Sequence, residues 1–207
     1  MSKQLGFYFD ADRCGSCRAC MAACIDKNGS AAGEKYRRVI DWEVGSWQDN
    51  GSGVPVPAGV YAYSVSVSCM HCADPACVAA CPTGAMTKRD DGIVYVDQEI
   101  CVGCGACAQA CPYNAPHLIS AAGVMGKCDL CRDLVDAGQN PACVDACLMR
   151  CLDWGDIDEL RERHGEGAWL EPLASPEATG PSMVIGTSRF CALGGEGSLG
   201  NSPEEIA

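Results

Sequence analysis

The sequence has few aromatic residues, only three histidines and no long apolar run. Phe, Tyr and Trp together make up 6% of the 207 residues, so the core needs something other than aromatic packing to organise it. No stretch of about 18 apolar residues is present, and residues 1–10 contain no apolar segment long enough for a signal peptide. We therefore expect a soluble chain that does not span a membrane and carries no export signal of its own.

Basic side chains are also scarce. The 15 Lys and Arg residues are outnumbered by 27 Asp and Glu, which gives a net charge of −12. So acidic a chain is not expected to bind nucleic acid. The sequence also lacks a Ser-His-Asp set, a phosphate-binding glycine loop, a carboxylate dyad and a flavin fingerprint. It therefore predicts no site for a small-molecule substrate and no catalytic activity of the chain alone.

Cysteine is present in large excess, with 18 residues. Disulfides would require an oxidising compartment and would not explain the regular spacing of sixteen of them, so metal-bound thiolates are favoured. These sixteen form four runs: the first run is Cys14, Cys17, Cys20 and Cys24; the second is Cys69, Cys72, Cys77 and Cys81; the third is Cys101, Cys104, Cys107 and Cys111; the fourth is Cys128, Cys131, Cys143 and Cys147.

The four runs are of two kinds. The first and third match at a constant offset of 87 residues and share the spacing C-x-x-C-x-x-C-x-x-x-C. The second and fourth share PACVxAC and differ mainly in the insert between their second and third cysteines, which is four residues in one and eleven in the other. In bacterial ferredoxins the first spacing sends its fourth cysteine to the other cluster. Each ferredoxin-like module is therefore expected to combine one run of each kind.

The order of the runs predicts an α+β fold of two bacterial-type, ferredoxin-like modules, each holding two [4Fe-4S] clusters. Short strands near residues 86–88 and 93–96 are expected to join the second and third runs. The predicted domains are an outer module over residues 1–24 and 120–170, an inserted β flap over 25–68, an inner module over 69–119, and an extended tail over 171–207 that lies on the body or on a partner.

Two local features complete the predicted fold. Within the flap, strands are expected over residues 36–44 and 60–67, separated by a flexible loop over 49–59. After the fourth run, Asp156 is expected to cap a short helix that stops at Gly165.

Zinc is the main alternative to iron and sulfide. The fourth run by itself has the spacing of a tetrahedral zinc site. Three cysteines two residues apart within one loop, as in the first and third runs, instead suit three corners of an iron-sulfur cubane. Three other side chains need separate expectations: His71 is predicted at the surface or next to the ligands of a cluster, Cys151 in packing rather than as a ligand replacing Cys147, and Cys191 as a free thiol.

The runs, together with YRRV, SCMHCADPACVAACPTGAM, CPYNAP, GKCDLC and LDWGDIDELRERHG, resemble the iron-sulfur subunit of dimethyl sulfoxide reductase and its relatives over nearly the whole sequence. This resemblance implies four [4Fe-4S] clusters and a role in relaying single electrons. The implied partners are a molybdopterin catalytic subunit and a quinol-binding membrane anchor. The implied location is at the membrane through these partners, either in the cytoplasm or on the outer face with a catalytic subunit exported by a twin-arginine signal.

The resemblance also implies crossed ligation, in which each cluster takes three cysteines from one run and the fourth from another. Two departures from the family pattern are Leu148, where proline is usual, and Cys151, where alanine is usual. The predicted sites are site 1 (Cys14, Cys17, Cys20, Cys147), site 2 (Cys69, Cys72, Cys77, Cys111), site 3 (Cys101, Cys104, Cys107, Cys81) and site 4 (Cys128, Cys131, Cys143, Cys24).

Two other functions remain open at this point. One is a zinc-stabilised interaction module with no redox role. The other is a free-standing multi-cluster ferredoxin, which the flap and the long tail disfavour.

Overall fold

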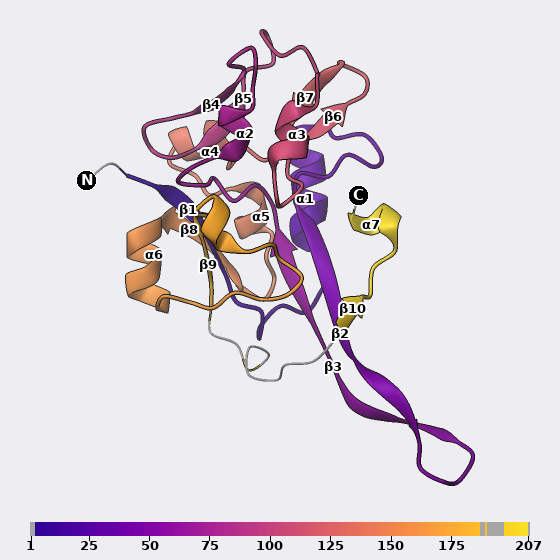
Figure 1. Cartoon of the computed structure of the whole chain (residues 1–207). Helices are drawn as coiled ribbons and strands as arrows, with labels where there is room; N and C mark the ends of the chain where they lie inside the picture. Colours follow the sequence, from indigo (N-terminus) through magenta and orange to yellow (C-terminus); the bar gives the residue numbers. More distant parts are fainter. Residues whose placement is uncertain (1–2, 187–188, 190–196, 207) are drawn as a thin grey trace.

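Pairs of consecutive strands are separated by short helices along the chain in a computed structural model that describes residues 3–186, 189 and 197–206 (Figure 1). Cys191 lies outside the described residues. In sequence order the elements are β1 (Leu5–Phe9), α1 (Ala19–Asn28), β2 (Arg38–Asp49), β3 (Pro55–Val67), α2 (Ala76–Ala79), β4 (Met86–Lys88), β5 (Val94–Val96), α3 (Ala106–Ala110), β6 (His117–Ile119), β7 (Val124–Gly126), α4 (Arg132–Asp136), α5 (Ala142–Asp145), β8 (Leu152–Asp156), α6 (Ile157–His164), the 3₁₀ turn η1 (Pro176–Ala178), β9 (Met183–Ile185), β10 (Gly197–Leu199) and α7 (Pro203–Ile206).

Antiparallel strand pairs connect the four cysteine runs in a closed cycle. β2 and β3 join the first run to the second, β4 and β5 join the second to the third, and β6 and β7 join the third to the fourth. β8, which follows the fourth run, pairs with β1, which precedes the first. The predicted short strands on either side of residues 89–92 are confirmed as β4 and β5. The pairing of β8 with β1 brings the fourth run back beside the first.

β1 is the central strand of a three-stranded sheet in the order β8-β1-β9. β9 comes from the predicted tail and pairs with β1 in parallel, with Phe7 opposite Met183 and Phe9 opposite Ile185. A three-residue strand is too short to show hydrophobic alternation, so the sequence pattern did not reveal it. The tail therefore contributes a strand to the body at this point.

The flap is a long hairpin of β2 and β3 that extends away from the body (Figure 1). The expected loop over residues 49–59 is wrong for most of its length, because β3 already begins at Pro55 and pairs through Pro57 with Trp47. Proline is tolerated there because β3 is an edge strand in the sheet order β10-β2-β3, where an N–H is not always needed for pairing. Only the residues between Asp49 and Pro55 form the turn.

Helix α6 begins and ends where the sequence predicts. The Asp156 carboxylate accepts a hydrogen bond from the Asp158 N–H at 3.0 Å, which caps the helix, and Gly165 follows its last residue. The same carboxylate accepts the N–H of Gln4 at 3.2 Å and so also holds the start of β1. No helix in the described part of the protein is long and apolar enough to cross a membrane.

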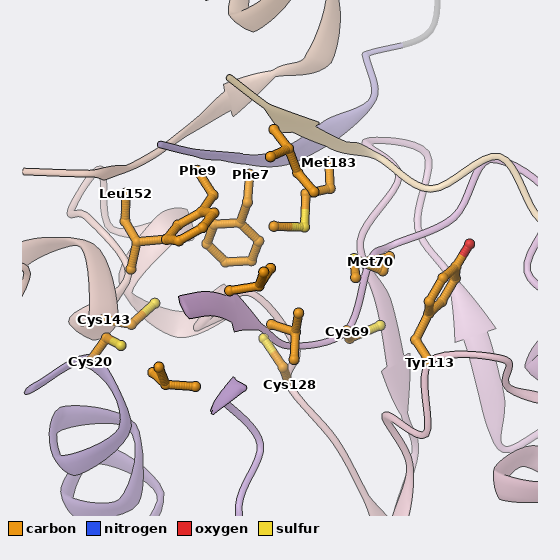
Figure 2. Packing of buried hydrophobic residues seen from close by; sticks show 14 of the residues in the cluster. Phe7, Phe9, Cys20, Cys69, Met70, Tyr113, Cys128, Cys143, Leu152 and Met183 are labelled. Carbon is orange, nitrogen blue, oxygen red and sulfur yellow. The ribbon is translucent and has the colours of Figure 1, made fainter. Parts of the chain in front are cut away.

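The main core combines a few aromatic side chains with cysteines, as Figure 2 shows. Phe7 and Phe9 from β1 lie with Leu152 of β8 on one side of this cluster. Thiols from different runs lie within it, namely those of Cys20, Cys69, Cys128 and Cys143. A second, smaller cluster contains Cys77, Met86, Val94, Cys107 and Met125. The cores are therefore built around the cysteine runs.

Candidate metal centres

The three leading cysteines of the third run line one small pocket. Cys81, from the second run, is the fourth thiol on its wall, while Cys111, the last cysteine of the third run itself, does not line it. The remaining lining is largely apolar and includes Met86, Val96 and Met125. The thiols predicted for site 3 are thus brought together around one pocket.

A second small pocket has the same construction at site 1. The first three cysteines of the first run line it together with Cys147 from the fourth run, and Cys24 does not. Cys151 is an additional lining residue. Since β8 pairs with β1, the backbone itself carries Cys147 to the first run.

The thiols of site 4 are all buried. Burial, together with the nearby Cys143 and Cys131 thiols, raises the pKa of Cys24 to about 12. Burial also raises the pKa of Cys128 well above its usual value, and Cys24 is the first of the thiols that add to this effect. The mutual influence places Cys24 of the first run among the thiols of the fourth.

Site 2 shows the same crossing between runs. Burial raises the pKa of Cys72 to about 11, with Cys69 and Cys111 adding to the shift. Burial likewise raises the pKa of Cys77 to about 12, and Cys69 and Cys111 again contribute. Cys111 therefore lies with the second run.

Left-handed backbone recurs at equivalent positions of the cysteine loops. In the first run, Ser16 and Arg18 have φ of 53° and 58°; their equivalents in the third run, Gly103 and Gly105, have 64° and 76°. In the second and fourth runs, the equivalent residues His71 and Leu130 have φ of 43° and 62°. Non-glycine residues adopt this region only when the surrounding structure requires it. The loops are consequently bent in the same way whether or not glycine is present.

Backbone N–H groups donate to several thiol sulfurs. Met86 N donates to Cys81 Sγ at 3.4 Å, and Met125 N donates to Cys101 Sγ at 3.4 Å. Cys151 N donates to Cys147 Sγ at 3.3 Å, and Ala115 N donates to Cys111 Sγ at 3.5 Å. Such bonds favour the thiolate form and are among the factors that set the potential of an iron-sulfur centre.

The structure decides between the two positions expected for His71, which is fully buried and not at the surface. Its Nδ1 accepts the N–H of Val94 at 3.0 Å, and its Nε2 lies 3.9 Å from Cys128 Sγ. The ring of His71 therefore lies next to a thiol of the fourth run, although His71 belongs to the loop of the second. The side chain is buried because β5 passes over it, a contact between runs that local sequence does not reveal.

Two residues close to the thiols were not anticipated from the sequence. Lys127 is buried, and its Nζ donates to the carbonyl oxygens of Val94 and Cys128. Arg37 is buried at 1% exposure, at the start of the flap. A buried cation is rare without a partner of opposite charge. Two features of the sequence could have pointed to these residues: Lys127 directly precedes Cys128, and Arg37 directly precedes the first strand of the flap.

Cys151 is buried at the edge of site 1, with its Sγ 3.4 Å from Cys147 Sγ. A hydrogen bond to Cys14 and burial raise its pKa, whereas the pKa of Cys14 is lowered because it accepts that bond. Cys151 therefore lies against two thiols of site 1. It also packs in the main core, which agrees with the role expected from its sequence position.

The donor sets fit iron-sulfur clusters. The seventeen described cysteines are all free of disulfides. Within residues 3–186, 189 and 197–206, no three His, Cys, Asp or Glu side chains converge on the position of a single metal ion. At sites 1 and 3 four thiols, three from one run and one from another, instead line a single largely apolar pocket. Four thiolates grouped in this way are the ligand set of an iron-sulfur cluster.

Comparison with known proteins agrees with this donor chemistry. Residues 60–157 match the model of a 4Fe-4S dicluster domain. The B subunit of the anaerobic dimethyl sulfoxide reductase of Haemophilus influenzae is 44% identical over 206 residues, which cover 99% of the present protein and all of that subunit. The corresponding B subunit of Escherichia coli is 46% identical over 89% of each protein. The chain belongs to the family of the iron-sulfur subunits of dimethyl sulfoxide reductase.

A subunit of a reductase for another sulfur compound is also similar to the present protein. The thiosulfate reductase electron transfer subunit of Salmonella typhi is 37% identical over 77% of the present protein and 79% of its own length. Family membership makes the present protein an iron-sulfur protein of the electron-transfer kind, a non-catalytic subunit within a larger oxidoreductase. The expected resemblance is thereby confirmed.

Proposed function

We propose that the protein holds four [4Fe-4S] clusters through sixteen cysteines in crossed ligation and relays single electrons between a quinol-oxidising membrane anchor and a molybdopterin catalytic subunit. The observation that carries this proposal is the set of cysteines that line the pockets of sites 1 and 3. Each is lined by three cysteines of one run and by the last cysteine of a different run. This is the arrangement of a bacterial ferredoxin, in which neighbouring clusters exchange their fourth ligands.

The four sites are neighbours in the order 1, 4, 2, 3, which supports a relay. Cys143 of site 4 is close enough to Cys20 of site 1 for its thiolate to add to the rise in the pKa of Cys20 that burial causes. Cys128 of site 4 is influenced in the same way by Cys69 of site 2. Cys77 of site 2 packs in one apolar cluster with Cys107 of site 3. No step in this order requires an electron to leave the protein interior.

The two ends of the order reach the surface, whereas its middle does not. Cys17 of site 1 and Cys104 of site 3 are exposed, but none of the thiols of sites 2 and 4 is. An electron can therefore enter or leave at sites 1 and 3, and the partner subunits are proposed to dock there.

Exposed apolar side chains surround both of these ends. Leu148, which follows Cys147, is 75% exposed, and the adjacent Met149 lines the cavity of site 1. Val102, between two cysteines of site 3, is 64% exposed. Apolar surface next to an exposed redox centre is suited to be covered by a protein partner, which would exclude water from the centre.

The residues of the protein supply the conditions for transfer. When bound, a [4Fe-4S] cluster takes up and releases one electron at a time. The apolar lining of sites 1 and 3 lowers the local dielectric, and the backbone N–H groups directed at Cys81, Cys101 and Cys147 stabilise negative charge on their sulfurs. The protein thus holds and tunes the clusters, and the substrate is left to the catalytic partner.

Anaerobic purification followed by metal analysis tests the proposal. We expect four iron and four sulfide atoms for each of four clusters, a brown visible absorption, and electron paramagnetic resonance (EPR) signals of interacting [4Fe-4S] centres after reduction. Zinc without sulfide would instead establish the interaction module, and iron for only two clusters would overturn the count of four. Co-purification with a molybdopterin subunit separates a complex subunit from a free-standing ferredoxin.

A further inference from the structure

Arg37 places a buried positive charge among thiols of two different sites. Its side chain is 1% exposed. Nη1 donates to Ser66 Oγ at 3.1 Å and weakly to Ser66 O at 3.4 Å, and Cζ lies 4.6 Å from the centre of the Phe7 ring. Ser66 and Phe7 thus hold the guanidinium in one orientation.

Two of the Arg37 donors have no acceptor. Nε and Nη2 are buried and make no hydrogen bond within the part of the protein that the structure describes. Arg37 also forms no ion pair with a described carboxylate. A buried guanidinium with unpaired N–H groups is strongly disfavoured unless a negative group satisfies it, so these donors require a partner that the polypeptide does not supply.

The thiols around Arg37 identify that partner. Burial alone would lower the pKa of Arg37, but the thiolates of Cys143, Cys20 and Cys128 outweigh this effect and raise it. Cys24 acts in the same direction, and the backbone N–H of Arg37 also donates toward its thiol. Three of these four thiols belong to site 4, and Cys20 belongs to site 1.

We propose that Arg37 donates charge-assisted hydrogen bonds from Nε and Nη2 to sulfur atoms of the cluster at site 4, and that this raises the reduction potential of that cluster above the value it would otherwise have. The inference rests on the proposed function. A cluster gains negative charge on reduction, and a fixed cation with donors directed at its sulfurs stabilises the reduced form more than the oxidised form. Site 4, the second in the order 1, 4, 2, 3, therefore holds an electron more tightly because of Arg37.

The same charge has a weaker effect on site 1. Only Cys20 of that site is among the thiols that Arg37 influences, and Ser66 Oγ lies between them, 3.4 Å from Cys20 Sγ and 3.1 Å from Arg37 Nη1. Sites 2 and 3 have no thiol among those that dominate the surroundings of Arg37. A graded effect, largest at site 4, distinguishes this role from a general loss of stability.

Arg38 provides the matched control. It is the next residue and is also buried, but its Nη2 donates to the carbonyl oxygen of Tyr113 at 2.8 Å. The thiol that influences it is Cys111 of site 2. Removing the charge of Arg38 therefore shows the effect of losing a buried arginine at this point of the chain, while the Arg37 guanidinium stays in place among the thiols of site 4.

The test is a redox titration of the purified complex, followed by EPR, for the unsubstituted protein and for Arg37→Gln, Arg37→Lys and Arg38→Gln. The signal of site 4 is the one altered by Cys131→Ser. With full iron and sulfide content, Arg37→Gln is expected to shift the midpoint potential of site 4 to a more negative value and that of site 1 by less. The midpoint potential of site 4 in Arg37→Lys should lie between those of the unsubstituted protein and Arg37→Gln, because an ammonium keeps the charge but loses the planar pair of donors.

Arg38→Gln should leave the potential of site 4 unchanged. An unchanged site 4 potential in Arg37→Gln, or an equal shift in Arg38→Gln, overturns the proposal. If Arg37→Gln assembles with incomplete clusters, Arg37→Lys decides: a site 4 potential equal to that of the unsubstituted protein overturns it. Iron and sulfide content of the unsubstituted protein tests the proposed function separately, so the two failures are distinguishable.

Discussion

The two halves of the molecule use the same cysteine loops but close them differently. In the proposed ligation, sites 2 and 3 take all their thiols from residues 69–111, where β4 and β5 pair across a short turn. Sites 1 and 4 take theirs from residues 14–24 and 128–147, which are brought together because Leu5 pairs with Asp156 and the rest of β1 with β8. Equivalent positions of the loops nevertheless share a left-handed backbone conformation, as at Arg18 and Gly105.

This difference shows that the conformation of each cysteine loop is set by its own residues. Bringing two runs together into a pair of sites instead depends on contacts between segments that can be far apart in the sequence. The inner half closes over few residues and so loses little chain entropy, while the outer half must order the two ends of a long loop. The outer half also has additional stabilising contacts: the tail strand β9 beside β1 and the Asp156 carboxylate that holds Gln4. Its thiols should therefore be the more sensitive to substitutions in the core.

The largest effect is expected from Cys111→Ser. Because Cys111 lies with Cys69 and Cys72 and does not line the cavity of site 3, its loss should convert the cluster at site 2 to a three-iron form or remove it. EPR should show this change while the signal that Cys104→Ser alters stays intact. If both substitutions alter the same signal, ligation is not crossed at sites 2 and 3, and the two halves of the molecule do not bind their clusters in the same way.

Next in size is a comparison of core truncations, one in each half. Phe9→Ala removes a fully buried ring beneath the outer sheet and should cost about 3–5 kcal/mol of unfolding free energy. Met86→Ala empties a position in the smaller core and should cost about 2–5 kcal/mol. We expect Phe9→Ala to release iron from sites 1 and 4 first, and Met86→Ala from site 3. Iron content and EPR after mild anaerobic heating measure this, and loss of the same clusters in both variants would remove the distinction.

A smaller effect is expected from Gly6→Ala in β1. A Cβ at this position would meet the carbonyl oxygen of Ser182, the residue that precedes β9. The backbone would have to separate, which should cost roughly 1–3 kcal/mol and release the tail from the outer sheet. Limited proteolysis should then cut the protein near residue 180 faster than in Ser182→Ala, which changes the facing residue without adding volume. Equal cutting rates would mean that β9 contributes little to the outer half.

The smallest effect is expected from Cys151→Ala. Removing this thiol leaves a small void in the core and should cost about 1 kcal/mol, while the iron content stays complete because Cys147 remains at site 1. The loss of the contact between Cys151 Sγ and Cys147 Sγ, which lie 3.4 Å apart, should slightly change the EPR signal of site 1. Conversion of site 1 to a three-iron form would show that Cys151, and not Cys147, is the ligand.

Short-range features were predictable from the sequence. The start of α6 at Asp156 and its end at Gly165 were predictable, because a helix cap and a helix-ending glycine both act within one turn of helix. β4 and β5 were predictable because a turn signal separates two runs of strand-forming residues. The length of the hairpin was not, since prolines that normally mark a loop are accommodated along the edge strand β3. β9 was not, because three residues carry no recognisable period.

The spacing of the cysteines by itself determined the number of thiols in each run and, in the first and third runs, their grouping, because three thiols within seven residues can only lie close together. Tertiary structure alone decided what surrounds those thiols. Arg37 comes among Cys20, Cys143 and Cys128, and the ring of His71 comes against Cys128, through contacts between segments that are far apart in the sequence. Such contacts depend on how the strand pairs pack together, and neither composition nor local periodicity encodes that in readable form.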